Sequence, residues 1–213
     1  NLVLDNALYI LMVIAVIVIQ VVNPNFLRPA SLVNILSQTA AYLPAALGIA
    51  GCIVLTGTDL SAGRAVGLTA CISASLLQVA GSASKMWPEL GTLPVALVIL
   101  IAVLLGAAIG AFNGFFVAKF KLHPFIVTLG TQLILYSCLL LYVQMGNNGG
   151  MAISSLDASY TDFVKGSFIS VPTGNGTSTP IPNYVWFAIL LAALMWFIWN
   201  KTTFGKNMFA LGS

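Results

Sequence analysis

Residues 93–118 read LPVALVILIAVLLGAAIGAFNGFFVA, a run of 26 residues that contains no charged side chain. An α-helix of this length extends about 39 Å, whereas the hydrocarbon core of a bilayer is about 30 Å thick. Apolar residues occupy nearly every face of such a helix, so no polar face is left for water. This stretch therefore predicts a membrane-spanning helix.

The rest of the chain repeats this pattern, with most charges in short gaps between apolar segments. Eight Lys and Arg and five Asp and Glu are too few to cover a soluble domain of 213 residues. Lipid must then cover much of the surface, and we predict an all-α integral membrane protein with about six transmembrane helices. The predicted spans are Ala7–Val22, a segment within 35–55, and residues 65–80, 93–118, 125–143 and 184–199.

The basic residues predict an orientation, because cytoplasmic loops are enriched in Lys and Arg. If the first span runs outward, five cations lie inside and three lie outside. The inner set is Arg64, Lys119, Lys121, Lys201 and Lys206, and the outer set is Arg28, Lys85 and Lys165. We therefore assign the net charge of +3 to membrane topology and expect a lipid environment and no nucleic-acid partner.

The second span contains residues that disturb a helix. Pro44 lacks a backbone N–H, and Gly48 and Gly51 follow it closely, so we predict a bent or broken helix. Gln38 and Thr39 enter the membrane just before this point. Spans interrupted by Gly or Pro often line transport pathways.

Further polar residues lie at the ends of the later spans. Asp59 lies just before the third span. We expect it to cap that helix, to take part in gating or substrate passage, or to do both. Arg64 is a candidate partner for an ion pair with Asp59. Asn113 lies deep in the fourth span and is expected to bond to another helix. Thr128, Thr131 and Gln132 form a polar edge on the fifth span.

Gly106, Gly110 and Gly114 recur every four residues in the fourth span. Such a stripe of small residues lets two helix backbones approach closely, so we assign these glycines to helix packing. Cys52, Cys71 and Cys138 are isolated within apolar spans, with no ligand spacing for a metal. No phosphate-binding loop and no nucleophile–base pair occurs, so the sequence predicts neither an enzyme nor a bound cofactor.

The long polar segment 144–183 is too hydrophilic to span, and we predict an external loop with a short amphipathic helix at 158–164. After the sixth span, residues 200–213 alternate basic, aromatic and glycine positions. Taken alone, this tail is a basic cytoplasmic loop.

Four segments occur together in one order: LTGTDLSAG at 55–63, IGAFNG at 109–114, PFIVTLGT at 124–131 and TFGKNMFALG at 203–212. With them the whole chain resembles the ribose/galactose/xylose-type permeases of ATP-binding cassette (ABC) importers. The sequences at 58–64 and 200–207 are most similar to those of the galactose/methyl-galactoside members.

The resemblance implies a permease subunit that moves a monosaccharide across the bacterial inner membrane by alternating access. Intact members have about ten membrane helices, so we expect residues 1–213 to be a fragment of one permease domain without its C-terminal helices. The implied partners are an ABC ATPase, which binds ATP and Mg, an external or periplasmic sugar-binding protein and a second permease copy. Residues 200–213 would begin the cytoplasmic coupling segment, with Lys201, Thr203, Phe204, Gly205, Lys206, Phe209 and Gly212 as the coupling candidates.

A sugar that leaves water must exchange the hydrogen bonds of its hydroxyl groups for bonds along the path. The candidates for these contacts are Gln38, Thr39, Thr58, Asp59, Asn113, Thr128, Thr131 and Gln132. Alternatives remain open: an ion-coupled secondary sugar transporter with Asp59 as its acid, an ABC permease for ribose, xylose or a nucleoside, and a channel or structural subunit.

Overall fold

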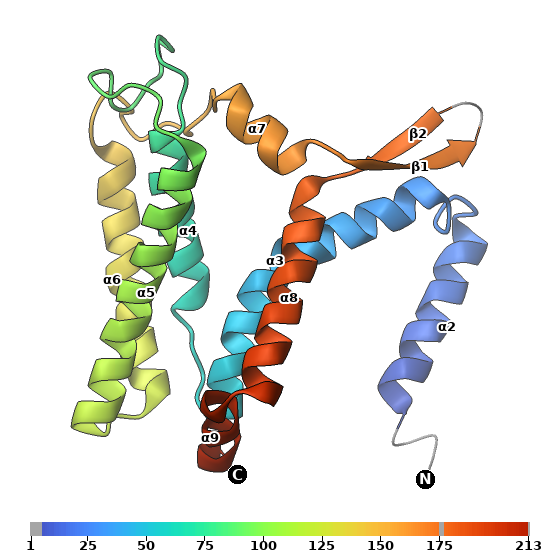
Figure 1. The fold of residues 1–213 in the computed structure, drawn as a ribbon, viewed down its shortest axis with the longest axis horizontal. Coiled ribbons are helices and arrows are strands. Elements are labelled where there is room, and N and C mark those ends of the chain that lie inside the picture. The colour runs from blue at the N-terminus through green and yellow to red at the C-terminus, as the bar shows by residue number, and fades with distance from the viewer. Residues whose placement is uncertain (1–5, 175–176, 213) are drawn as a thin grey trace.

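The computed structural model describes residues 6–174 and 177–212, which form apolar helices joined by short connections, with one β-hairpin (Figure 1). The predicted class, an all-α integral membrane protein, is confirmed. The elements in chain order are α2 (Ala7–Val22), α3 (Pro29–Val54), α4 (Ala62–Leu76), α5 (Val95–Phe120), α6 (Pro124–Gln144), α7 (Ala158–Lys165), β1 (Ile169–Gly174), β2 (Thr177–Ile181), α8 (Asn183–Lys201) and α9 (Thr203–Gly212).

Within the described residues, α3, α5, α6 and α8 have the length and hydropathy to cross a membrane, while α2 and α4 are apolar but shorter. The start of α2 and the end of α8 lie on the same side of the molecule (Figure 1). This placement agrees with an even number of crossings. The third span was predicted to reach residue 80, but α4 ends at Leu76.

Helix α4 ends early because the buried Gln78 bonds to the backbone of two loops. Its Nε2 donates to the carbonyls of Ser84 at 3.1 Å and Ser154 at 3.0 Å, and its Oε1 accepts from the N–H of Met86 at 2.8 Å. These bonds satisfy a fully buried amide and fix the connections above α4 and α6. The chain therefore leaves the helix here although Leu77, Val79 and Ala80 are apolar.

Helix α3 is bent but not broken. It runs without interruption from Pro29 to Val54 with Pro44 inside, and Figure 1 shows it turning from a course across the molecule to one alongside α8. Proline removes one helical hydrogen bond and its ring pushes against the preceding turn, which explains the bend. The predicted break is therefore wrong, and the predicted bend is confirmed.

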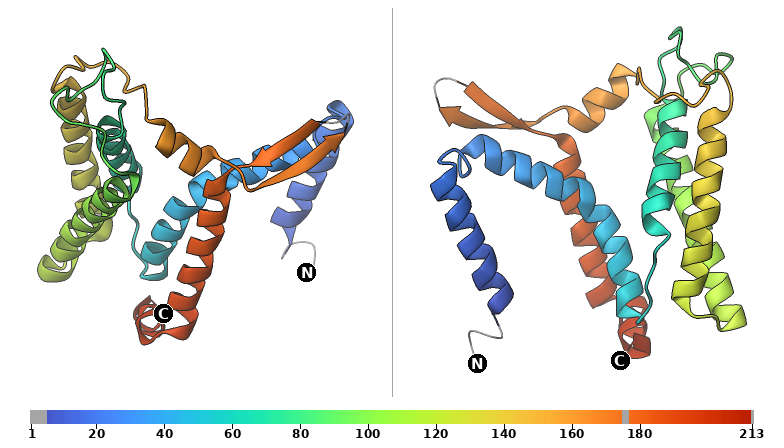
Figure 2. Two further views of the ribbon diagram at one scale, coloured as in Figure 1. Left: turned by 45° about the horizontal axis from the view of Figure 1, so that its top comes forward. Right: turned by 180° about the vertical axis from the view of Figure 1, so that it is seen from behind.

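The helices form two packed groups, and α2 stands apart from both (Figure 2). Helices α4, α5 and α6 lie side by side, and α3 packs along α8. A small core between α3 and α8 contains Ala40, Val185 and Ala188. No residue of α2 is buried. Much of the apolar surface is thus left for lipid or for other protein.

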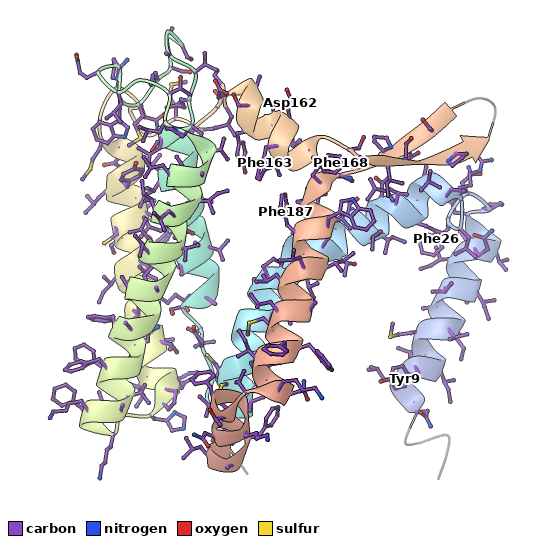
Figure 3. The ribbon with its side chains drawn as sticks, viewed as in Figure 1. Tyr9, Phe26, Asp162, Phe163, Phe168 and Phe187 are labelled. Atoms are coloured by element: carbon purple, nitrogen blue, oxygen red, sulfur yellow. The ribbon has the colours of Figure 1, made fainter. Side chains whose placement is uncertain are left out.

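The segment 144–183 contains α7, as predicted, and also a hairpin of β1 and β2 that was not predicted. The strands are antiparallel, with Ile169 opposite Ile181 and Ser170 opposite Pro180. Helix α7 is held against α8 by Phe163 and Phe187, whose ring centroids lie 5.1 Å apart (Figure 3). The hairpin then lies across the first half of α3.

Candidate functional site

The central feature of the helix group α4 to α6 is that α4 begins inside it. The chain leaves α3 after Val54, and residues 57–59, which have no regular secondary structure, precede the start of α4 at Ala62. Figure 1 shows this start well above the lower ends of α5 and α6. Non-helical backbone at membrane depth is tolerated only where protein or a water-filled cavity satisfies its polar groups. The segment 55–61 is therefore a candidate position for a functional site within the membrane.

Asp59 organises the turn into α4. Its Oδ1 accepts hydrogen bonds from the N–H of Ser61 at 2.8 Å and from the Oγ of Ser61 at 2.7 Å. The side chain therefore accepts from an exposed amide at the start of the third span, as the sequence predicted. Its charge also lies at the positive end of the α4 dipole.

Two further residues join this turn to α5 and α6. The Nδ2 of Asn113 donates to the Oγ of Ser61 at 2.9 Å, and the Oγ1 of Thr131 donates to the Oδ1 of Asn113 at 2.6 Å. Ser61, Asn113 and Thr131 are all buried. We call the chain from Thr131 through Asn113 and Ser61 to Asp59 the polar relay. It links three elements at one level of the bundle.

Thr128 satisfies the backbone of the non-helical segment. Its Oγ1 accepts from the N–H of Leu60 at 3.2 Å and donates to the carbonyl of Thr58 at 3.1 Å. The carbonyl of Phe125, in its own helix, is a more distant acceptor at 3.4 Å. The Thr128 side chain is 4% exposed. One buried hydroxyl thus pairs with a donor and an acceptor that no helix satisfies.

The depth of this network follows from helix geometry. Asn113 lies seven residues before the end of α5, and Thr131 lies seven residues after the start of α6. At 1.5 Å per residue, both lie about 10 Å from the connection between these helices. The polar relay is therefore well within the span rather than at its edge.

A cavity of about 260 Å³ adjoins the network on the α3 side. This is just below the range of about 300 to 1,000 Å³ typical of small-molecule sites. Asp59, Asn113 and Thr128 supply polar groups at its wall, and Gly110 and Gly114 supply backbone. The rest of the wall is apolar, with Leu55, Val117 and Pro124 among its residues, and the space can hold several waters or a small molecule.

The predicted contact at the glycine stripe is not made within the described chain. A Cβ added at Gly106, Gly110 or Gly114 would meet no atom within 4 Å, apart from the backbone of its own helix. No other described helix packs closely there, because α4 and α6 contact α5 on other faces.

Five of the predicted path residues are brought together, namely Thr58, Asp59, Asn113, Thr128 and Thr131. Gln38 and Thr39 are exposed on α3, before Pro44, and the Thr39 hydroxyl bonds to the carbonyl of Ile35 in its own helix. Gln132 is half-buried on α6. The sequence reasoning missed Ser61, which the Asp-x-Ser spacing could have revealed, since Asp often bonds to the backbone two residues on.

Arg64 does not pair with Asp59. Its guanidinium lies over the ring of Tyr136, with 4.4 Å from Cζ to the ring centroid. The two residues are on α4 and α6, so this contact also fixes the level of Arg64 in the span. Arg64 was predicted on the inner side of the membrane; because the chain re-enters the bundle before α4 begins, it lies beside α6 rather than in a connecting loop.

The tail after α8 is a helix, α9, rather than the basic loop that the sequence suggested. Gly205 packs on the carbonyl of Trp199, and Gly212 packs on that of Val54, so closely that a Cβ at either glycine would overlap the carbonyl. Phe204 is 63% exposed and Phe209 is 48% exposed, and Thr203 and Lys206 are also exposed. The Nζ of Lys201 lies 5.6 Å from the ring centroid of Trp196. The helix is thus fixed at its glycines and presents its aromatic side chains outward.

No group of three or more His, Cys, Asp or Glu that could hold a metal occurs among the residues described. Cys52, Cys71 and Cys138 are free thiols.

Comparison with known proteins identifies relatives along nearly the whole chain. The galactose/methyl galactoside import permease protein MglC of Escherichia coli (strain K12) is 41% identical over 208 residues, which are 98% of this chain and 60% of that protein. MglC of Haemophilus influenzae is 40% identical over the same shares of each protein. The ribose import permease protein RbsC of Escherichia coli (strain K12) is 28% identical over 95% of this chain and 56% of the relative. No solved structure matches.

The chain thus spans about 60% of the length of the MglC proteins named above. A family model described as branched-chain amino acid transport system / permease component matches residues 31–213. The match includes α3 from its third residue and all of α4 to α9, and therefore the polar relay and the cavity beside it. The chain belongs to this permease family, and it is a multi-pass protein of the bacterial inner membrane.

Proposed function

We propose that this chain is part of a permease subunit of a binding-protein-dependent ABC importer and that its substrate is a monosaccharide, with galactose or a methyl galactoside first. The observation that carries the proposal is the identity of 41% to a galactose/methyl galactoside import permease over 98% of this chain. The similarity to ribose permeases makes ribose the next substrate to test. The subunit itself is a transport component and not an enzyme.

The proposed path passes the cavity beside the polar relay. A sugar carries many hydroxyl groups, each of which needs a hydrogen-bond partner when water is removed. Asp59, Asn113 and Thr128 line this cavity with such groups, and Thr58 is exposed at its wall. Contacts of this kind are few and weak, which suits a pathway that must release its substrate. Thr131 contributes at this level through its bond to Asn113, and Gln38, Thr39 and Gln132 remain candidates for other levels of the path.

The proposed coupling element is α9. Phe204 and Phe209 would enter a groove of the ATPase as apolar anchors, while Lys201 and Lys206 would orient the contact. Movement of the ATPases on binding ATP and Mg would then reach α3 and α8, because Gly205 and Gly212 hold α9 close to both helices. In this proposal 144–183 faces outward, toward a sugar-binding protein, and a second permease copy completes the transporter.

The test is uptake of radiolabelled sugar by proteoliposomes that hold the full-length subunit, its ATPase and the binding protein. Galactose is expected to be taken up in preference to glucose, ribose and xylose, and uptake is expected to require ATP and the binding protein. Preference for ribose would correct the substrate but keep the importer. Uptake without ATP that an ionophore abolishes would instead establish an ion-coupled transporter.

Coupling is tested with the double variant Phe204→Ala and Phe209→Ala. We expect sugar-stimulated ATP hydrolysis and uptake both to fall, while the subunit still reaches the membrane. Phe197→Ala is the matched control, because Phe197 is 54% exposed on α8 and outside the tail. Equal activity of the double variant and the control would refute the assigned role of α9.

A further inference from the structure

Arg64 places a positive charge near the middle of the span. Its guanidinium lies 4.4 Å from the centroid of the Tyr136 ring, and Tyr136 is twelve residues after the start of α6. At 1.5 Å per residue this is about 18 Å into a helix of about 30 Å. Arg64 therefore lies about 8 Å beyond the level of the polar relay.

The guanidinium has five N–H donors at its edges, and the Tyr136 ring covers only one of its faces. In the part of the chain that the structure describes, no residue accepts a hydrogen bond from Arg64 and no carboxylate lies within ion-pair distance. The Arg64 side chain is exposed, and Tyr136 is 40% exposed. The donors are thus open on the outside of the α4–α6 group.

Lipid is an unfavourable neighbour for these donors. A charged side chain at the centre of a bilayer is costly, and such residues almost always face the interior of a bundle or a water-filled cavity. Arg64 lies too deep for its stem to extend to the membrane surface, because its guanidinium is held at Tyr136. The exposed side of Arg64 must then face water, a polar ligand or another protein surface.

A second polar side chain lies on the same side of α6. Gln132 precedes Tyr136 by four residues, which puts the two side chains one above the other on one helix face. Gln132 is half-buried. Gly67 on α4 packs against Leu139 of α6, one turn beyond Arg64 and Tyr136, so the two helices are in close contact at this level. Arg64, on α4, and Gln132 and Tyr136, on α6, are therefore carried by two helices that pack closely together.

We propose that Arg64, Gln132 and Tyr136 form a binding surface for a neutral polyol, at mid-depth on a water-filled passage. Tyr136 is the positioning residue, since its ring centroid lies 4.4 Å from the guanidinium Cζ. Arg64 donates to the hydroxyl oxygens of the passing molecule, and the Gln132 amide supplies a further donor and acceptor. The polyol as ligand rests on the proposed function, whereas the wet face rests on the depth of Arg64 and on its open N–H donors.

The wet face is tested first, without reference to transport. Arg64→Cys is placed in a full-length subunit whose Cys52, Cys71 and Cys138 are replaced by Ala, and the complex in liposomes is treated with a charged, membrane-impermeant maleimide. The control is Ile134→Cys, because Ile134 is 55% exposed on the same stretch of α6 but on another face. Labelling of the Arg64→Cys thiol and not of the control supports the passage.

Two outcomes of this test overturn the proposal. One is labelling of the Arg64→Cys thiol only by an uncharged, lipid-soluble maleimide, which would mean that the face lies in lipid. The other is a disulfide between the Arg64→Cys thiols of two copies, which would mean that the face is buried between protomers. Both outcomes leave the proposed importer function intact.

Ligand binding is tested by galactose uptake in the complete complex. Arg64→Gln and Tyr136→Leu are expected to lower the rate of uptake about tenfold at limiting sugar, because donors to the sugar are lost or misplaced. Arg64→Lys is expected to be intermediate, and Tyr136→Phe close to wild type. Arg28→Gln, at the exposed start of α3, is the matched control.

Wild-type rates in Arg64→Gln and Tyr136→Leu would overturn the polyol surface even if the passage is wet. A parallel loss of basal ATP hydrolysis and of folded protein in both variants would also overturn it, because the residues would then act only in packing. A wild-type complex with no ATP-dependent uptake would refute the proposed function, and with it the choice of ligand. The maleimide result would still decide whether the face is wet.

Discussion

Replacement of Thr128 by Val is the most informative perturbation of the non-helical segment. Valine keeps the shape of the side chain and removes the hydroxyl. Two groups then lose their hydrogen-bond partner, the N–H of Leu60 at 3.2 Å and the carbonyl of Thr58 at 3.1 Å. Neither group belongs to a helix that could satisfy it.

The expected cost follows from these two groups. An unsatisfied buried donor or acceptor costs about 1 to 3 kcal/mol. Hydrogen bonds between membrane helices average about 0.6 kcal/mol when measured by double-mutant cycles, with a maximum of about 1.7 kcal/mol. Water from the adjoining cavity can replace part of the loss, because Thr128 lies at its wall. We therefore expect Thr128→Val to lower the free energy of unfolding by about 2 kcal/mol.

The assay is reversible unfolding of the full-length subunit in mixed lipid and detergent micelles. Thr69→Val is the matched control, because the Thr69 hydroxyl bonds only to the carbonyls of Ala65 and Val66 in its own helix. The control should change the free energy of unfolding by less than about 0.5 kcal/mol. Equal effects of the two variants would refute the claim that Thr128 supports the segment before α4.

Three further changes test other parts of the structure. Gly212→Ala is expected to abolish coupled uptake, because the added methyl group would overlap the carbonyl of Val54 at the end of α3. Gly63→Ala is the control, because the space around Gly63 is open. Normal uptake by Gly212→Ala would contradict the close packing of α9 on α3. Lys85→Met should raise the melting temperature, because the Lys85 Nζ is buried with no hydrogen-bond partner among the described residues; a lower melting temperature would reveal a partner. Hydrogen bonds from Ser159 lower the pKa of Asp157 in the folded chain. The Asp157 carboxylate therefore stabilises α7 at a pH above the pKa that Asp157 has in the unfolded chain, and this stability is lost as the pH falls through its pKa in the folded chain. Amide exchange in α7 should therefore speed up in acid beyond its intrinsic pH dependence, and Asp157→Asn should remove that excess.

Much of the fold could be predicted from apolar length and from Pro44. Each predicted span contains a helix, and the bend of α3 follows from the chemistry of proline. The hairpin could not be predicted in the same way, because Pro172 and Pro180 lie within its strands. Proline usually argues against a strand, and it is accommodated here because a two-stranded sheet consists only of edges.

The residues of the polar network were predicted in part, because their contacts depend on where the third span begins. Asp59, Asn113, Thr128 and Thr131 were identified because polar residues are conspicuous in apolar surroundings. Their mutual contacts depend on where α4 starts relative to α5 and α6, which no local pattern encodes. For the same reason the sequence could not show that Arg64 lies beside Tyr136 rather than pairing with Asp59.

Gln38 and Thr39 show that polar residues near a proline do not by themselves identify which residues lie beside the polar relay. Both are polar residues near a Pro-containing bend, as at many transport sites. The structure places them on the exposed side of α3, away from the polar relay. Periodicity could not separate the two locations, because α3 carries apolar residues on nearly every face.

The most direct test of the central claim is the initial rate of galactose uptake by proteoliposomes that contain the full-length subunit, its ATPase and the binding protein. The rate is compared with and without enclosed ATP, with and without the binding protein, and with and without an ionophore. We predict uptake that depends on ATP and on the binding protein and that the ionophore leaves unchanged. Uptake that persists without ATP and stops with the ionophore would contradict the claim that this chain is part of an ABC importer.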